Sequence, residues 1–144
     1  MRPLGEILGQ MSKNAGLLRR AVDAYNRRDV DALLAELDPD VEWAPALPGM
    51  VGGDAIVYRG AEGIRQMFHD LFEVLDEIHF SYDDVRDLGD RVIAIGSIRT
   101  RGKASGAETR SPYVNVAELR DGKGIRLRGY LDVDEALRDA GVDP

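Results

Sequence analysis

Cysteine is absent from the sequence. Its absence excludes disulfide bonds, thiolate-bound zinc, iron–sulfur clusters and a cysteine nucleophile. Long apolar runs are also lacking: none approaches the roughly 18–20 residues of a membrane span, and residues 1–6 contain no apolar segment of a secretory signal. The formal net charge is −7, the wrong sign for a nucleic-acid-binding surface. We therefore expect a cytoplasmic protein that contacts neither nucleic acid nor membrane, and no motif indicates a cofactor or a metal site.

The chain has 144 residues, a length typical of one domain. Residues 1–11 combine a proline and two glycines with weak periodicity, so they are predicted to form a loose leader. Residues 12–144 contain neither an internal repeat nor a linker. We expect them to form a single domain.

Apolar residues at helical spacing predict four helices. Ser12 and Asp29 are the expected N-caps of the first two, because their side chains can accept a hydrogen bond from a free backbone amide. The third has the clearest apolar stripe, and Gly141 is placed to end the fourth. The predicted helices are 12–28, 30–37, 61–75 and 134–140.

Alternating apolar residues predict strands. One short strand, 41–43, precedes a proline- and glycine-rich loop over 44–60, and loops of this length are typically functional or mobile. Four longer strands joined by glycine-containing turns follow the third helix, at 78–86, 91–100, 112–119 and 124–132. Helices followed by a strand meander predict an α+β fold with helices packed on one face of an antiparallel sheet.

The strand at 91–99 is apolar on both faces. Val92, Ala94 and Ile98 lie on one face, and Ile93 and Ile95 lie on the other. An antiparallel sheet needs only one apolar face unless the second is also covered. Helices on both sides of a curved sheet would cover both faces, but we favour a homodimer through the outer face.

The order of these elements resembles the NTF2-like superfamily and, within it, the SnoaL-like proteins. The resemblance implies a cone-shaped, curved antiparallel sheet wrapped by three main helices, with a pocket between sheet and helices. Pockets of that kind commonly take small, mostly apolar molecules. The resemblance covers about residues 12–142 and depends on four motifs in order: Tyr58-Arg59-Gly60, Leu88-Gly89-Asp90-Arg91-Val92, Arg120-Asp121-Gly122-Lys123, and Tyr130-Leu131-Asp132 before Glu135-Ala136-Leu137.

The catalytic residues known in the superfamily are not matched. Ketosteroid isomerases use an Asp base on the first strand, with a Tyr and a protonated Asp as the oxyanion hole. Matching their pattern places Trp43 at the base, Ala21 at the Tyr and Asn115 at the protonated Asp. The acid on the last strand, used by limonene-epoxide hydrolases and several SnoaL-type polyketide cyclases, falls on Gly129. The family's triads are therefore absent, although an Asn amide can still donate to an oxyanion.

Three residues are candidates for catalysis. Asn115 and Tyr113 are predicted on the inner sheet face, where either could donate a hydrogen bond to a developing oxyanion, and a cross-strand or turn hydrogen bond is the structural alternative for Asn115. His79 alternates with Ile78 and Phe80 and could face the cavity as a general base. The alternative bases are carboxylates: Asp54, Asp83 and Asp84.

The other candidates are mainly apolar and would line the pocket around a small apolar or aromatic organic ligand. They come from the predicted helices, the first strand, the long loop and the inner sheet face. These residues are Tyr25, Trp43, Met50, Tyr58, Met67, Phe68, Phe72, Ile98, Leu127 and Gly129.

We therefore expect a SnoaL-like protein that binds a small, mostly apolar organic molecule. If it is an enzyme, the expected reaction is isomerisation, cyclisation or hydration of a carbonyl-bearing compound. One alternative is a non-catalytic carrier, favoured if no titratable residue lies within reach of the ligand. The other is a dimeric association module whose pocket is filled by Met67, Phe72 and Trp43.

Overall fold

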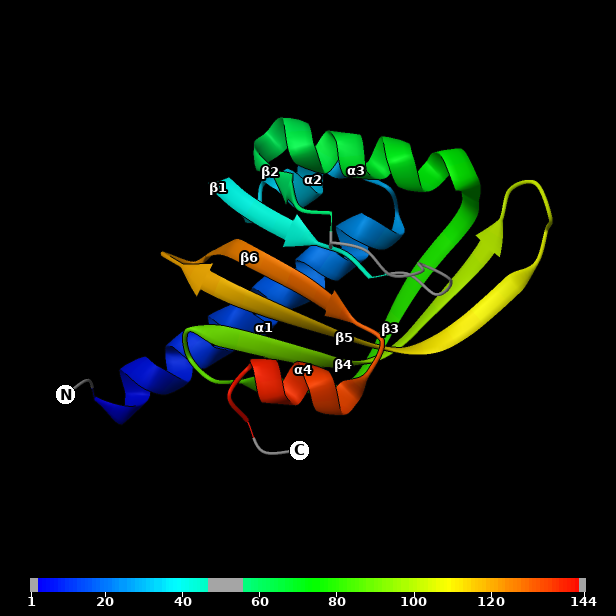
Figure 1. The fold of residues 1–144 in the computed structure, drawn as a ribbon. Coiled ribbons are helices and arrows are strands. Elements are labelled where there is room, and N and C mark those ends of the chain that lie inside the picture. Colours follow the sequence, from blue (N-terminus) through cyan, green and yellow to red (C-terminus); the bar gives the residue numbers. More distant parts are fainter. Residues whose placement is uncertain (1–2, 47–55, 143–144) are drawn as a thin grey trace.

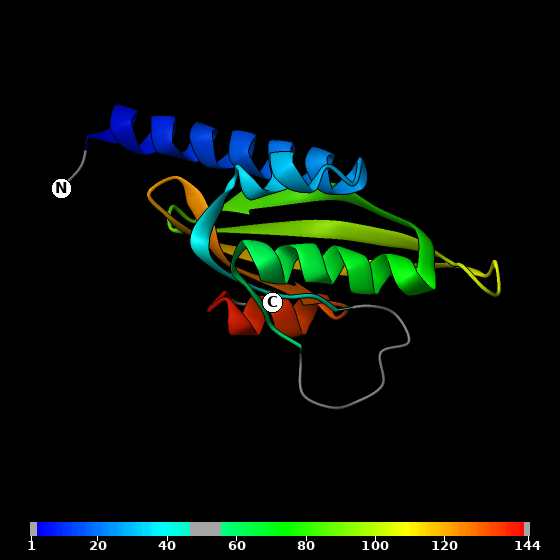
Figure 2. The ribbon, with the colours of Figure 1, turned by 90° about the horizontal axis from the view of Figure 1, so that it is seen from above.

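The computed structural model describes residues 3–46 and 56–142, apart from the side chains of residues 4–12. A curved six-stranded sheet has helices on both faces (Figure 1). Helices α1, α2 and α3 lie over one face, called the inner face below, and α4 lies against the outer face. Seen from above, α1 and α3 both run along the length of the strands (Figure 2). The α+β class is as the sequence predicts, but helices lie on both faces of the sheet and not on one face only.

The predicted helices and strands are all present. The helices are α1 (Leu4–Asn26), α2 (Val30–Leu34), α3 (Gly60–Val74) and α4 (Val133–Asp139). The strands are β1 (Leu37–Ala44), β2 (Tyr58–Arg59), β3 (Leu75–Asp87), β4 (Arg91–Gly102), β5 (Glu108–Arg120) and β6 (Lys123–Tyr130). The two-residue strand β2 was not predicted, because so short a segment has no detectable alternation.

The strands lie in the order β2-β1-β6-β5-β4-β3. β3, β4, β5 and β6 are antiparallel neighbours, as predicted. β1 pairs with β6 in parallel, with Trp43 beside Leu127. The sheet is therefore antiparallel along β3–β6 and parallel at this pair, which local sequence cannot reveal because the two partners are distant in the chain.

Helix α1 begins earlier than predicted. It starts at Leu4 with Pro3 at its N-cap, so Ser12 lies inside the helix and does not cap it. Most of the predicted loose leader is helical, since the helix continues through Gly5 and Gly9 despite their poor helix propensity. Across the two described ranges, no helix combines the length and the apolarity needed to cross a membrane.

Two of the residues predicted at helix termini, Asp29 and Gly141, are confirmed. Asp29 caps α2, where its carboxylate accepts a hydrogen bond of 3.0 Å from the Ala32 amide. Gly141 follows α4 with a φ of 77°, a left-handed conformation that suits glycine. α2 ends at Leu34, short of the predicted end at Leu37, because Leu37 is already in β1.

The apolar residues on the outer face of β4 and β5 have partners within the same chain. Ile93, Val114 and Val116 pack against Ala136 and Leu137 of α4. Both faces of β4 are thus covered by helices, which is the explanation that the sequence left as the alternative. This part of the outer face does not need a second copy of the chain.

Candidate functional site

A group of polar side chains lies within the apolar core of the inner face. We call it the Tyr–Asn cluster, and it consists of Tyr25 on α1, Tyr82 on β3, and Tyr113 and Asn115 on β5. Strand alternation places Tyr113 and Asn115 on the same face, where they are 1% and 5% exposed. The ring of Phe80 lies among the three tyrosine rings, with its centroid 4.7 Å from that of Tyr25 and 4.9 Å from that of Tyr113. The cluster therefore joins helix and sheet.

Hydrogen bonds satisfy part of this cluster. The Ala46 amide donates to the Tyr113 hydroxyl oxygen, and the Asn115 amide group donates to the Tyr82 hydroxyl oxygen. Asn115 Oδ1 is buried without a hydrogen-bond partner. Each of these two phenols thus accepts one hydrogen bond and keeps its own proton.

Burial keeps the three phenols protonated. It raises the pKa of Tyr113 to about 12 and raises the pKa values of Tyr25 and Tyr82 well above the ordinary tyrosine value, because a phenolate loses its hydration in the core. Neutral phenols donate hydrogen bonds but do not accept protons as bases near neutral pH. The Tyr–Asn cluster can therefore bind a polar group or stabilise an oxyanion, and it contains no general base.

Gly129 of β6 lies opposite Asn115 of β5, and the ring of Tyr113 lies close to it. A Cβ atom built on Gly129 would lie 2.6 Å from Tyr113 Cζ and 3.0 Å from the Ala46 nitrogen, and it would overlap the Tyr113 hydroxyl. The resemblance pointed to an acid at position 129 in related enzymes. In this chain the phenol of Tyr113 fills the space in which such a side chain would begin.

Most of the predicted pocket residues are packed core. Tyr25, Trp43, Met67, Phe68, Ile98 and Leu127 are at most 6% exposed and belong to one apolar cluster with Tyr113. Tyr58 and Phe72 are partly buried at its border. The Tyr58 hydroxyl donates to Asp70 at 2.8 Å, and the Arg28 guanidinium lies over the Phe72 ring. Met50 lies outside the described residues.

The candidate bases are not beside the cluster. Ile78 and Phe80 are buried on the inner face, so His79 between them projects from the outer face and is exposed. Asp83 and Asp84 are also exposed, near a bulge in β3. Asp54 lies outside the described residues. The expectation that His79 faces the cavity is therefore not met, for the simple reason that its strand neighbours occupy the inner face.

A solvent-accessible groove reaches the cluster between α1 and the edge strand β3. Its volume is about 480 Å³, within the usual range for small-molecule sites. Leu18 and Val22 of α1 and Val85 of β3 give it an apolar lining, and Tyr82 forms part of its wall. We call it the α1–β3 groove. Since Tyr82 also hydrogen-bonds Asn115, one side chain connects the groove with the buried amide.

Tyr82 is the functional candidate that sequence reasoning missed. The sequence contained the pattern that would have predicted it. Ile78, Phe80 and Tyr82 are at alternating positions and therefore share one face of β3, the face that packs against the core. The bulge between Tyr82 and Asp84 ends that alternation, and the acidic residues after it gave the segment a polar character.

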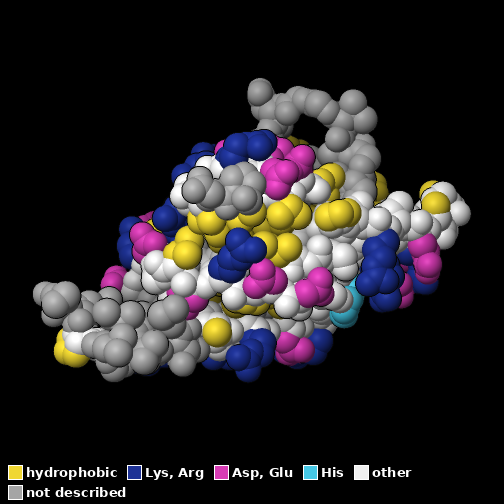
Figure 3. All heavy atoms as spheres, turned by 90° about the horizontal axis from the view of Figure 1, so that it is seen from below, with side chains coloured by type: hydrophobic (Ala, Val, Ile, Leu, Met, Phe, Trp, Pro, Cys, Tyr) yellow, Lys and Arg dark blue, Asp and Glu magenta, His cyan; other side chains and the backbone are white. Residues whose placement is uncertain are grey.

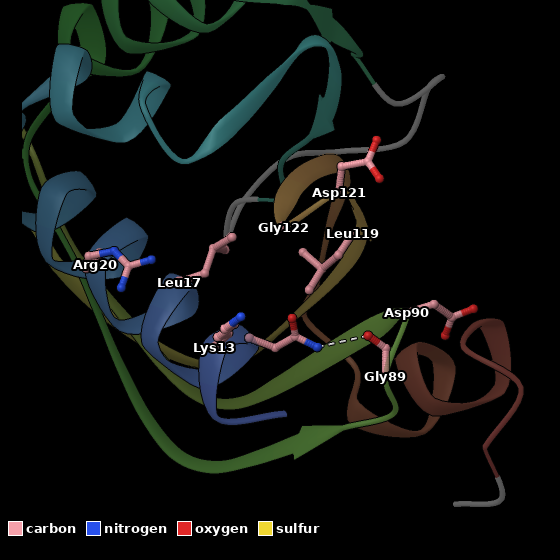
Figure 4. A pocket seen from close by; sticks show the side chains of 9 residues that line it. Lys13, Leu17, Arg20, Gly89, Asp90, Leu119, Asp121 and Gly122 are labelled. Carbon is pink, nitrogen blue, oxygen red and sulfur yellow. Dashed lines mark hydrogen bonds between the residues drawn. The ribbon is translucent and has the colours of Figure 1, made fainter. Parts of the chain in front are cut away.

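A second cleft of about 690 Å³ lies along a different face of α1, between Lys13 and Arg20, where the β3–β4 and β5–β6 turns approach the helix. Figure 4 shows Leu17 on the helix and Leu119 on β5 projecting toward one another across it. Asn14, 1% exposed, donates to the Gly89 carbonyl at 2.8 Å and to the Asp87 carboxylate at 3.2 Å. These bonds fix the β3–β4 turn against the helix.

Ligand-type residues for a metal come together at one place in the described chain. His69, Asp70 and Glu73 lie on the polar face of α3 with ligand atoms within 4.8 Å of one another. The Asp70 carboxylate already accepts hydrogen bonds from Tyr58 and Gln66. This arrangement is explained as a surface network of hydrogen bonds.

Several solved structures share this fold. An NTF2-like protein of unknown function from Burkholderia pseudomallei is 23% identical, with 88% of this chain and 95% of that chain covered and a TM-score of 0.73. TerC, co-crystallised with polyporic acid, is 24% identical, with 88% and 96% covered and a TM-score of 0.72. A putative polyketide cyclase from Xanthomonas campestris pv. campestris is 21% identical, with 90% and 97% covered and a TM-score of 0.68. At these identities the similarity establishes the fold and leaves the activity open.

Comparison at the level of families is more specific. No curated protein matches the chain. A family model described as the SnoaL-like domain matches residues 18–127, a range that runs from α1 into β6 and includes the whole Tyr–Asn cluster. Because this match covers well over half of the sequence and the architecture agrees with it, the chain belongs to the SnoaL-like domain family of NTF2-like proteins.

Proposed function

We propose that this protein binds a small, mostly apolar organic molecule in the α1–β3 groove, with the polar group of that molecule hydrogen-bonded to the Tyr–Asn cluster. One observation carries the proposal: Asn115 Oδ1 is buried with no hydrogen-bond partner. A buried acceptor left unpaired costs about 1–3 kcal/mol. Such a group calls for an explanation, and a bound ligand that supplies the missing donor is one.

The groove and the cluster together define the ligand. Leu18, Val22 and Val85 offer apolar surface for its hydrocarbon part. Within the groove the phenol proton of Tyr82 would donate to a ligand oxygen, and a ligand hydroxyl or N–H group that reaches past the Tyr82 ring would donate to Asn115 Oδ1. An apolar compound that carries both a carbonyl and a hydroxyl group therefore fits best.

The same residues favour binding over proton transfer. The phenols remain protonated because burial raises their pKa values, and the candidate bases His79, Asp83 and Asp84 are exposed. A carrier needs no base, whereas an isomerase or cyclase of this site would need one from outside the Tyr–Asn cluster. As an enzyme, the protein would use Tyr113 and Asn115 to stabilise an oxyanion on a carbonyl-bearing substrate.

The names of structural neighbours suggest which compounds to test. One neighbour is co-crystallised with polyporic acid, and two others are described as polyketide cyclases. Aromatic polyketides and polyporic acid therefore join steroids, terpenoids and fatty acids as trial ligands.

Replacing Asn115 with leucine is expected to abolish ligand binding without unfolding the protein. The substitution removes the unpaired acceptor but also the hydrogen bond to the Tyr82 hydroxyl, so its two effects on the free energy of unfolding of the free protein should largely offset one another. A bound ligand at about 100 times its Kd stabilises the native state by about 2.7 kcal/mol. Thermal unfolding of the wild type with such a ligand should thus shift upward by several degrees, and Asn115→Leu should show no shift.

Two further variants make this result interpretable. Tyr82→Phe keeps the ring in the groove and removes one donor, so it should weaken binding. Ser81→Ala changes the adjacent residue, whose side chain is exposed on the opposite face of β3, and should bind as the wild type does. Unchanged ligand shifts in both Asn115→Leu and Tyr82→Phe would refute this site. Turnover of a bound compound would then separate an enzyme from a carrier.

The homodimer through the outer face is a separate proposal. Figure 3 shows hydrophobic side chains on this side of the molecule, bordered by charged ones, and Leu131 next to α4 is 36% exposed. Apolar surface bordered by polar residues is typical of association sites. Sedimentation equilibrium should give twice the monomer mass, whereas a monomer at micromolar concentration would contradict the proposal.

A further inference from the structure

Two arginines lie directly opposite one another on the outer face of the sheet, near the turn that joins β4 and β5. Arg99 of β4 is in register with Arg110 of β5, and both side chains are exposed. Ile98, the neighbour of Arg99, belongs to the core of the inner face, so strand alternation directs Arg99 outward. Directly opposed side chains have Cβ atoms about 4.5–5.5 Å apart. The register therefore brings the two side chains together, and we call them the Arg99–Arg110 pair.

The Arg99–Arg110 pair has no acidic partner. Among the side chains that the structure describes, no carboxylate forms an ion pair with either guanidinium. The next row of residues toward the turn is different, because there Arg101 lies in register between Glu77 and Glu108. The Arg101 guanidinium is 3.5 Å from the Glu77 carboxylate. Acidic residues thus neutralise one row of the outer face and leave the neighbouring row positive.

His79 extends this positive row across a third strand. It is in register with Arg99 and is exposed on the same face. An imidazole offers at least one N–H donor in either protonation state. The next row toward the middle of the sheet, which consists of Ser81, Ser97 and Pro112, carries no charge. Figure 3 shows a histidine side chain beside a group of Lys and Arg side chains on this side of the molecule.

The Arg99–Arg110 pair lowers the stability of the sheet unless an anion lies between the two guanidiniums. Like charges directly opposite one another on neighbouring strands are destabilising. The chain contains 26 Asp and Glu against 19 Lys and Arg, so acidic residues are in excess, yet none pairs with these two arginines. An anion from solution would supply the negative charge that the chain does not provide at this position.

From this arrangement we infer that the Arg99–Arg110 pair binds a phosphate group, either inorganic phosphate or the end of a phosphate monoester. A phosphate monoester has three acceptor oxygens and a charge of about −1.5 to −2 at pH 7. Two guanidiniums match that charge and offer two forks of N–H donors, whereas one guanidinium already satisfies a carboxylate. His79 donates a further hydrogen bond. The inference is independent of the proposed function, because none of these residues lines the α1–β3 groove.

Amide chemical-shift titration of the full-length protein with sodium phosphate tests the site. Sodium chloride keeps the ionic strength constant, so that general screening of charges does not contribute to the response. We expect saturable shifts at residues 97–101 and 108–112, and binding of acetate at least fivefold weaker than that of phosphate. Phenyl phosphate distinguishes the two sources of the group. An affinity equal to that of phosphate would identify the phosphate group alone as the ligand, and a higher affinity would identify an organic phosphate.

Substitutions of the two arginines should weaken phosphate binding without loss of stability. Arg99→Gln and Arg110→Gln should each lower the affinity about fivefold, the upper end for one exposed ion pair, and the double variant should show no saturable binding. Arg110→Lys should bind between Arg110→Gln and the wild type, because lysine keeps the charge and loses the fork of donors. Each Gln variant removes a like-charge contact, so it should be at least as stable as the wild type.

Arg65→Gln is the control for a change of net charge, because Arg65 is exposed on α3, which covers the inner face of the sheet. Its phosphate affinity should equal that of the wild type. No saturable response to phosphate, acetate binding as tight as phosphate binding, or unchanged affinity in both Gln variants would each overturn the inference. A dimer that dissociates in those variants, with no response to phosphate, would assign the pair to an interface between two copies and would overturn it as well.

Discussion

The substitution Gly96→Ala is expected to lower the free energy of unfolding by about 3 kcal/mol or more. A Cβ atom on Gly96 would lie 2.7 Å from Tyr82 Cα and would overlap the Ser81 carbonyl oxygen of β3. Both are backbone atoms, so no side-chain rotation can relieve the overlap. β3 would have to separate from β4, and overpacking that displaces backbone commonly costs 1–3 kcal/mol or more.

Denaturant unfolding of Gly96→Ala and the wild type measures this loss. Gly16→Ala is the matched control, because Gly16 lies inside α1 and its Cβ would meet only the end of the Arg20 side chain, at 3.2 Å. Alanine is a better helix former than glycine by about 1 kcal/mol, so this variant should be stabilised. A Gly96→Ala protein as stable as the wild type would show that β3 and β4 are further apart than described.

The second large effect is expected for Gly129→Ala, which should disrupt both stability and ligand binding. The new methyl group would overlap the Tyr113 hydroxyl and lie 2.6 Å from Cζ of the same ring. Tyr113 is 1% exposed and packed against Phe80, so the ring cannot turn toward solvent. We expect a loss of about 2–3 kcal/mol, together with loss of the ligand-induced shift in thermal unfolding.

A double-mutant cycle tests whether the effect passes through the Tyr113 hydroxyl. Tyr113→Phe removes that oxygen and relieves part of the overlap, so Gly129→Ala should cost less in the Tyr113→Phe background than in the wild type. Coupled residues usually show interaction energies of about 0.5–3 kcal/mol. Strictly additive effects would mean that the alanine methyl is accommodated elsewhere and that Gly129 has no special relation to Tyr113.

Local signals in the sequence were sufficient for most of the secondary structure. Apolar periodicity located α3 and the four long strands to within a few residues, and Asp29 and Gly141 mark helix ends because capping depends on a single side chain or backbone angle. The start of α1 was missed, because no side-chain cap marks Pro3 and the glycines at positions 5 and 9 weaken the helical pattern.

The candidate site was only partly accessible from the sequence. Alternation in β5 placed Tyr113 and Asn115 on the inner face, and the structure brings them together with Tyr25 and Tyr82. Alternation in β3 also predicts that His79 points to the opposite face from Ile78 and Phe80. The sequence does not show which of these two faces packs against the helices, and the structure shows that Ile78 and Phe80 belong to the core of the inner face.

The sequence by itself determined the α+β class and the order of the elements. Those properties depend on residues close together in the chain or on the identity of single residues. Tertiary structure decided that β1 joins β6 in parallel, that α4 covers Ile93, and that Asn115 Oδ1 is buried without a hydrogen-bond partner. Each of these depends on contacts between residues far apart in the chain, whose geometry is set by how the whole core packs.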